Sequence, residues 1–192
     1  MNNFDLHTPT RILFGKGAIE NLRDQIPADA RVLVTYGGGS VKKTGVLDQV
    51  LSALNGIDVR EFGGIEPNPS YETLMNAVKI ARDEKITFLL AVGGGSVLDG
   101  TKFIAAAAHY NADSDPWEIL ETYGSKVASA IPMGSVLTLP ATGSESNKGA
   151  VISRKTTGDK RAFMSSHVQP VFAILDPVYT YTLPPRQVAN GV

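Results

Sequence analysis

The fold is decided by the stretch Phe88-Leu89-Leu90-Ala91-Val92-Gly93-Gly94-Gly95-Ser96-Val97-Leu98-Asp99-Gly100-Thr101-Lys102. It joins five apolar residues to three glycines and then to a segment that becomes rich in alanine. A short, wholly apolar run is typical of a central strand in a parallel sheet, which is covered on both faces. Glycines permit a tight turn, and alanines favour a helix. The stretch therefore predicts a strand, a glycine turn and a helix over residues 96–109.

The same arrangement occurs earlier in the chain. The run Val32–Tyr36 precedes Gly37-Gly38-Gly39-Ser40-Val41, which repeats the five-residue phrase of residues 93–97. Apolar periodicity predicts further strands at 59–62, 131–139 and 171–175, a hairpin within 152–163, and helices at 18–25, 46–54 and 71–84. Strands and helices that alternate are typical of a parallel sheet. We therefore predict an α/β fold, a doubly wound, mostly parallel, Rossmann-like sheet with helices on both faces.

Composition excludes several classes of function. The 192 residues are 43% hydrophobic and carry a net charge of −1, with charges of both signs spread evenly, so we expect no nucleic-acid partner and no membrane-binding patch. There is no cysteine, which excludes disulfides, thiolate metal sites and a cysteine nucleophile. No stretch approaches the roughly 20 apolar residues of a membrane span, and residues 1–5 do not resemble a signal peptide. A cytoplasmic location is expected.

Both glycine turns are candidate phosphate sites. Glycine lets a phosphate approach the backbone, and the N-terminus of the following helix favours an anion. Two such turns in one sheet predict a ligand with phosphates at two places, such as a dinucleotide. Asp99 and Lys102 follow Ser96 by three and six residues, so they lie about one and two turns along the helix. The alternative is a plain connection with Asp99 serving the helix dipole and Lys102 in solvent.

The first glycine turn lacks a carboxylate, since residues 35–47 contain no Asp or Glu. A carboxylate past a strand end usually receives the ribose hydroxyls of NAD and would repel the 2′-phosphate of NADP. Lys42 and Lys43 add positive charge. The pattern favours NADP over NAD, and the substitution Gly39→Asp is expected to reverse that preference. The alternative is two solvated lysines beside a plain turn.

The remaining polar residues give weaker signals. Thr142 and Ser144 flank a glycine after a predicted strand, where they could bind an amide or a phosphate or simply form a turn. His7, His109 and His167 are scattered without metal-ligand spacing and are expected on the surface or in loops. No catalytic triad, carboxylate pair or Walker lysine is recognised. The chain has a binding apparatus without an evident acid, base or Lewis acid.

In combination, the motifs resemble the iron-containing (group III) alcohol dehydrogenases. They are Gly94-Gly95-Ser96-x-x-Asp99-x-x-Lys102, Thr142-Gly143-Ser144-Glu145, Ile174-Leu175-Asp176-Pro177 and Thr182-Leu183-Pro184-Pro185. Nearly the whole chain is similar to the bacterial branch of NADPH-dependent aldehyde reductases and butanol dehydrogenases. Glycerol dehydrogenases and dehydroquinate synthases share the glycine-serine-aspartate turn but fit the other motifs less well. A nucleotide-binding module without chemistry, or a natural truncation, is the other alternative.

The resemblance implies an NADP(H)-dependent enzyme acting on aldehydes or alcohols, with residues 1–180 as the dinucleotide-binding domain and 181–192 as the start of a helical metal-binding domain. It also implies a homodimer in which residues 4–14 pair between chains. The implied cofactor contacts are Gly38, Gly39 and Ser40 for the 2′-phosphate, Asn68, Pro69, Thr138 and Tyr179 for the adenine, Gly94, Gly95, Ser96 and Val97 for the pyrophosphate, Asp99, Thr142 and Ser144 for the nicotinamide side, and Lys160 for a ribose hydroxyl.

The family's divalent metal, Zn or Fe, is held by an Asp-x-x-x-His run and two later histidines, and the run would begin just after Val192. We therefore predict no metal ligand and no catalytic residue in this chain. The chain alone is expected to lack significant reductase activity, and metal-dependent turnover of butyraldehyde with NADPH would contradict this. Lys148 departs from the small or apolar residue of relatives and lies either at a pocket rim or simply in solvent.

Overall fold

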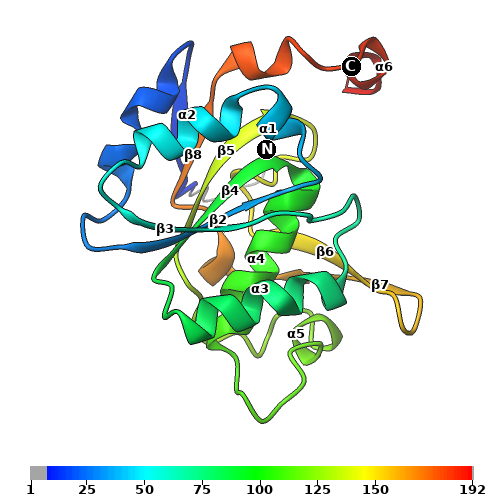
Figure 1. Ribbon diagram of the computed structural model, residues 1–192. Coiled ribbons are helices and arrows are strands. Elements are labelled where there is room, and N and C mark those ends of the chain that lie inside the picture. Colours follow the sequence, from blue (N-terminus) through cyan, green and yellow to red (C-terminus); the bar gives the residue numbers. More distant parts are fainter. Residues whose placement is uncertain (1–7, 192) are drawn as a thin grey trace, which may run out of the picture.

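A six-stranded sheet forms the centre of the computed structural model, which describes residues 8–191 (Figure 1). The strand order is β1-β8-β5-β4-β2-β3, and every neighbouring pair is parallel. The strands are β1 (Arg11–Phe14), β2 (Arg31–Tyr36), β3 (Asp58–Phe62), β4 (Phe88–Gly94), β5 (Met133–Leu139) and β8 (Phe172–Leu175). The predicted parallel α/β fold is confirmed.

Helices connect the strands. They are α1 (Ser40–Lys43), α2 (Val46–Ala53), α3 (Tyr71–Asp83), α4 (Gly95–His109), α5 (Glu118–Glu121) and α6 (Pro185–Gly191). Helix α3 begins as predicted, because the Ser70 side chain accepts a hydrogen bond from the backbone N–H of Thr73. The predicted helix at residues 18–25 is wrong in type. It consists of the 3-10 turns η1 (Ala18–Asn21) and η2 (Arg23–Gln25), since this short segment lies between left-handed Gly17 and Pro27.

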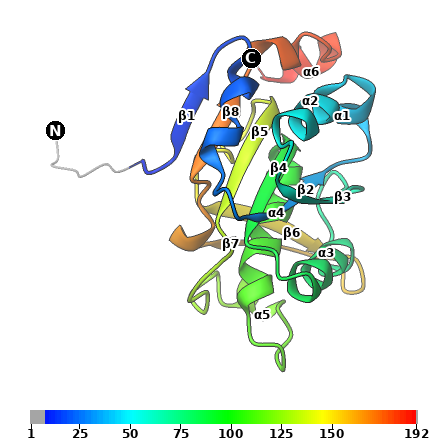
Figure 2. The same cartoon turned by 60° about the vertical axis from the view of Figure 1, so that its left-hand side comes forward.

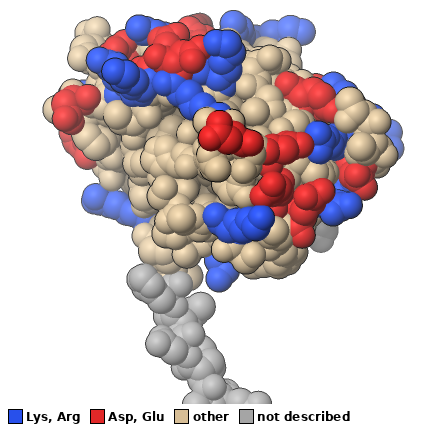
Figure 3. All heavy atoms as spheres, turned by 90° about the horizontal axis from the view of Figure 1, so that it is seen from below, with Lys and Arg blue, Asp and Glu red and all other residues tan. Residues whose placement is uncertain are grey.

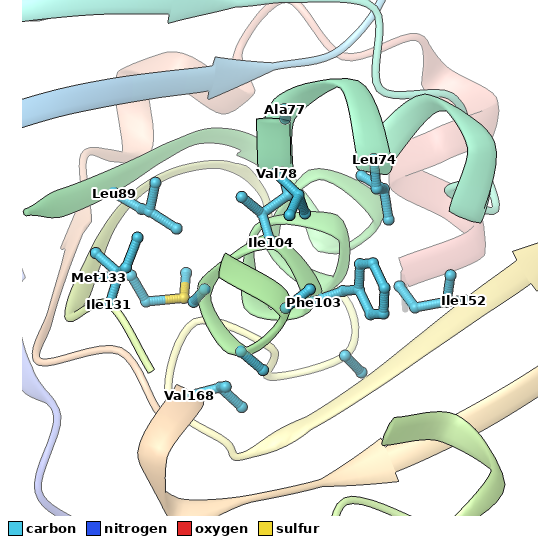
Figure 4. Packing of buried hydrophobic residues seen from close by; sticks show 14 of the residues in the cluster. Leu74, Ala77, Val78, Leu89, Phe103, Ile104, Ile131, Met133, Ile152 and Val168 are labelled. Carbon is cyan, nitrogen blue, oxygen red and sulfur yellow. The ribbon is translucent and has the colours of Figure 1, made fainter. Parts of the chain in front are cut away.

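Apolar side chains pack on both faces of the sheet. On one face, Leu74 and Val78 of α3 and Phe103 of α4 belong to one buried cluster with Leu89 of β4, and Ile104 lies in the middle of the cluster (Figure 4). On the other face, α2 and the 3-10 turns cover strands β2 and β4; the buried residues there include Leu22, Val34, Leu47, Val50 and Leu90. The sheet is therefore covered on both sides, as its apolar central strands require.

A two-stranded antiparallel hairpin, β6 (Gly149–Arg154) and β7 (Asp159–Met164), lies outside the main sheet (Figure 2). Its turn is tied to α3 by Glu72, whose carboxylate accepts hydrogen bonds from the backbone N–H groups of Lys155 and Thr156 at 3.2 and 3.1 Å. The predicted hairpin is thus confirmed, and it forms a wall beside the N-terminal half of α4.

Of the helices within residues 8–191, none is long and apolar enough to cross a membrane. The face shown in Figure 3 carries acidic and basic side chains interspersed around an uncharged centre. That face therefore presents no continuous basic surface to a phosphate backbone.

Candidate functional site

The second glycine turn joins the end of β4 directly to the start of α4. The N-cap of α4 is Gly94, which has no side chain to accept hydrogen bonds from the first helical turn. A Cβ on Gly93 would lie 2.7 Å from Cγ2 of Val97, and a Cβ on Gly95 would lie 2.9 Å from Oγ1 of Thr142. The close packing therefore needs glycine at position 93, whereas the Thr142 hydroxyl beside Gly95 can rotate. The positive end of a 15-residue helix stays available to an anion.

A groove of about 310 Å³ opens in front of this helix end. It brings together seven of the residues that the sequence predicted to bind the cofactor: Asn68, Pro69, Gly95, Ser96, Asp99, Thr142 and Lys160. Leu139, Ala141 and Val151 complete the lining. Lys160 comes from strand β7 of the hairpin, and its Nζ donates a hydrogen bond of 2.8 Å to Oδ1 of Asn68 across the groove. The hairpin thus contributes a cation to a site otherwise built at the carboxyl edge of the sheet.

A larger pocket of about 620 Å³ adjoins the groove, and Asp99, Thr142 and Val151 line both. Ser144 and Asn147 line the larger pocket. Lys148 also lines this pocket and is exposed. The pocket position and the solvent exposure considered for this residue therefore occur together. Asp99 therefore stands where the helix end, the groove and the wider pocket meet.

Lys102 is fully buried rather than in solvent, which overturns the plain-connection alternative for this residue. Its Nζ donates to Oγ of Ser144 at 2.9 Å, to Oδ1 of Asn147 at 2.9 Å and to the carbonyl of Gly149 at 2.8 Å. Ser144 in turn donates to Oδ1 of Asp99 at 2.7 Å. Two of the three predicted nicotinamide-side residues, Asp99 and Ser144, are therefore joined through a hydroxyl that also contacts a buried cation.

The first glycine turn, which holds Gly38, Gly39 and Ser40, is open. A Cβ on Gly38 or Gly39 would meet no atom within 4 Å. The backbone of Gly39 is left-handed, with φ of 108°, so a side chain there is strained. Lys42 lies 4.9 Å from the ring centre of Tyr36, a cation–π contact.

One carboxylate near this turn escaped the sequence prediction. The hydroxyl of Tyr36 donates to Oε2 of Glu61 at 3.1 Å. Glu61 belongs to the neighbouring strand β3, so a search of residues 35–47 does not reach it. The first glycine turn itself contains no acidic residue, but Glu61 of β3 contacts Tyr36, the residue that precedes it.

Three predicted contacts lie differently from the rest. Val97 is buried, with its side chain packed beside Gly93 and Gly37, so only its backbone can face a ligand. Thr138 is half-buried near the end of β5. Tyr179 lines a separate pocket of about 320 Å³, where its hydroxyl donates to Oε1 of Gln49 at 3.0 Å. The structure therefore does not bring Tyr179 into the groove.

The loop that carries Asn68 and Pro69 is held by Glu66. Oε1 of this residue accepts hydrogen bonds from Nζ of Lys155 at 2.8 Å and from Oγ1 of Thr73 at 2.7 Å. Burial alone would raise the pKa of Glu66, but these hydrogen bonds outweigh it and lower the pKa to about 2. The charged carboxylate therefore stabilises one wall of the groove.

This shift predicts a specific acid sensitivity. A carboxyl group with a depressed pKa contributes stability that is fully present above its unfolded pKa of about 4.3 and is lost as the pH falls. We expect the free energy of unfolding to fall from pH 5 towards pH 2 more steeply in the wild type than in a Glu66→Gln variant. Urea unfolding at successive pH values measures both. Equal slopes for the two proteins would contradict the prediction.

The histidines and acids supply no metal centre in the described part of the chain. His109 and His167 are exposed, as predicted, and His7 lies outside the described residues. Among residues 8–191, no three or more His, Asp or Glu side chains gather in a way that could hold a metal ion. Within residues 8–191, the side chains therefore offer no ligand set that fits a divalent metal.

Comparisons with known proteins agree with this geometry. The NADPH-dependent aldehyde reductase YqhD of Escherichia coli K12 is 82% identical over 192 residues, covering 100% of this chain and 50% of that protein. Its crystal structure superposes with a TM-score of 0.97 over 99% of this chain and 49% of that chain. The NADH-dependent butanol dehydrogenase A of Thermotoga maritima is 40% identical, with a TM-score of 0.93 over 100% of this chain and 48% of its own.

The chain spans about half the length of the relatives that it matches. The family model described as iron-containing alcohol dehydrogenase matches residues 9–177, which is most of the chain. This chain therefore belongs to the iron-containing alcohol dehydrogenase family.

Proposed function

We propose that this chain is the cofactor-binding part of an NADP(H)-dependent alcohol dehydrogenase or aldehyde reductase. The complete protein would transfer hydride between NADPH and short- to medium-chain aldehydes. The observation that carries the proposal is the groove, which runs past the uncapped start of α4 and lies between Lys160 and Asp99. The similarity to the E. coli aldehyde reductase over the whole chain supports it.

The residues of the groove suit the parts of a dinucleotide. The first backbone N–H groups of α4, at Gly95 and Ser96, would bind the pyrophosphate, since the helix dipole and free donors favour an anion there. Lys160 would donate to a ribose hydroxyl or a phosphate. Asp99 would accept hydrogen bonds near the nicotinamide, which supplies the hydride when the cofactor is bound. These residues bind and orient; we place no acid or base among them.

The preference for NADP over NAD rests on the first glycine turn rather than on the family. One relative is named as NADPH-dependent, whereas the T. maritima relative is named as NADH-dependent. In this chain, Gly38, Gly39 and Ser40 leave open space and add no carboxylate. A 2′-phosphate would fit there beside the positive charge of Lys42.

The backbone conformation of the first glycine turn makes Gly38 a better position than Gly39 for testing the cofactor preference. Because Gly39 is left-handed, Gly39→Asp would strain the backbone as well as add charge. Gly38 does not have a positive φ and faces open space, so Gly38→Asp adds charge alone. We expect this change to weaken NADPH binding by about tenfold or more, or about 1.4 kcal/mol, while NADH binding is kept or improved.

Calorimetric titration with both cofactors measures the switch, and Gly38→Ala serves as the uncharged control. An equal loss of affinity for NADPH and NADH in the Asp variant would show that the first turn does not select the cofactor.

Other parts of the proposal concern the complete protein. The divalent metal, Zn or Fe, would be bound outside residues 8–191, and residues 181–192 would begin the domain that holds it. We also propose a cytoplasmic homodimer. Strand β1 is an edge strand with exposed Ile12 and Phe14, which suits pairing with a second copy, although residues 4–7 of the proposed pairing segment lie outside the described residues.

A further inference from the structure

Lys102 is the one lysine that is fully buried in the described part of the chain. Its hydrogen bonds orient the neighbouring Ser144 hydroxyl and Asn147 amide. An ammonium group has three donors and no acceptor. Its three hydrogen bonds go to Oγ of Ser144, Oδ1 of Asn147 and the carbonyl of Gly149. A buried cation is tolerated only when it is hydrogen-bonded and balanced by charge, and Asp99 supplies the nearby negative charge.

These contacts fix the direction of the Ser144 hydroxyl. Because Oγ of Ser144 accepts from Lys102, its single proton is free to point elsewhere, and it is donated to Oδ1 of Asp99 at 2.7 Å. Oδ2 of Asp99 accepts from the backbone N–H of Val151 at 3.0 Å. Asp99 and Ser144 therefore offer acceptors, and no proton, to a ligand in the adjoining groove and pocket.

We propose that Lys102 is a positioning residue that makes Asp99 and Ser144 an acceptor-only surface, which selects a hydrogen-bond donor on the nicotinamide half of the cofactor. This inference rests on the proposed function, that the groove binds NADP(H). The donor is a hydroxyl of the nicotinamide ribose or the amine of the carboxamide. Lys102 acts through Ser144 and Asp99 and does not itself touch the cofactor.

The same contacts hold the loop that shapes the pocket. Oδ1 of Asn147 accepts from Lys102 and also from the backbone N–H of Gly149 at 3.0 Å, so the amide nitrogen must face the other way. That nitrogen donates to the carbonyl of Thr142 at 3.3 Å. Without the cation, the Asn147 amide keeps its contacts with Gly149 and Thr142, but the Ser144 hydroxyl loses the donor that fixes its direction, and the acceptor-only surface is no longer enforced.

The variant Lys102→Met tests the proposal with two probes. NADPH reports on the whole cofactor, whereas adenosine 2′,5′-bisphosphate lacks the nicotinamide and its ribose. We expect the variant to bind NADPH about tenfold more weakly and to bind the bisphosphate within twofold of the wild type in calorimetry. Equal losses for both probes, or no loss for either, would overturn the positioning role. If the wild type bound neither probe, the proposed function itself would fail.

A measurement on the wild type avoids any folding defect of the variant. Burial lowers the pKa of Lys102 to about 8, although Asp99 on α4 and Glu145 in the loop after β5 oppose that shift; β6 faces the ammonium with the uncharged Gly149 carbonyl. The ammonium is therefore lost as the pH rises through about 8. The ratio of NADPH affinity to bisphosphate affinity should fall between pH 7 and pH 9. A constant ratio would contradict the proposal.

The two sources of the donor can be separated with the 3-acetylpyridine analogue of NADP⁺, in which a methyl group replaces the carboxamide amine. If Lys102→Met weakens NADP⁺ but not the analogue, the amine is the selected donor. If it weakens both equally, the ribose hydroxyl is the donor. If it weakens neither, the proposal is wrong.

Discussion

The substitution Gly95→Asp is expected to reduce the affinity of the chain for NADPH by about a hundredfold or more. The new carboxylate would stand at the first position of α4, where the pyrophosphate is proposed to bind, and like charges placed together cost several kcal/mol. A hundredfold loss corresponds to about 2.7 kcal/mol. The added Cβ would also press on Oγ1 of Thr142, from which it would lie 2.9 Å away. Isothermal titration calorimetry with NADPH measures the effect.

Two controls separate charge from shape. Gly95→Ala adds the Cβ alone, and we expect it to weaken binding far less than the Asp variant because the Thr142 hydroxyl is the end of a rotatable side chain. Ser52→Asp adds the same charge to an exposed position on α2 and should leave binding unchanged. Binding by the Gly95→Asp variant within threefold of the wild type would mean that phosphates do not occupy this turn.

Phe103→Ala is expected to lower the free energy of unfolding by about 3–5 kcal/mol. Phe103 is fully buried on α4, and its ring meets Tyr71 and Phe163 edge-on at centre distances of 5.6 and 6.5 Å. Its removal leaves a cavity where α3, α4 and the hairpin meet, and packed walls collapse only in part. Since a domain is stable by only about 5–15 kcal/mol, much of the margin would be lost.

Urea unfolding followed by circular dichroism measures this loss. Tyr181→Ala removes an aromatic ring that is 76% exposed and should change the stability by less than about 0.5 kcal/mol. A loss below about 1 kcal/mol for Phe103→Ala would show that the hairpin and helices are not packed around this ring as described.

The fold could be predicted because its local signals agree. The apolar run 88–92, the glycines and the alanine-rich segment each favour the element that forms, and Ser70 caps α3 as expected. The failure at residues 18–25 has a physical reason. Apolar spacing there resembles a helix, but left-handed Gly17 and Pro27 bound the segment, which forms two 3-10 turns instead.

From the residues alone, the candidate site was predictable only where its residues follow strand ends; Asn68, Pro69 and Lys160 were predicted only through the family resemblance. Gly95, Ser96 and Asp99 share one turn, so their proximity follows from the helix itself. The burial of Lys102 does not, since its three acceptors lie 42, 45 and 47 residues further along the chain. Glu61 was missed for the same reason, because it approaches the first glycine turn from a neighbouring strand. Tyr179 was predicted beside the adenine, but in the structure it lines a separate pocket and does not line the groove.

We propose that this chain binds NADP(H) and that its two glycine turns hold phosphates at two places. Calorimetric titration of the wild-type chain with NADPH and with NADH measures this binding. We predict binding of NADPH at one site per chain, with an affinity higher than that for NADH. If neither cofactor bound, the chain would not be a dinucleotide-binding domain.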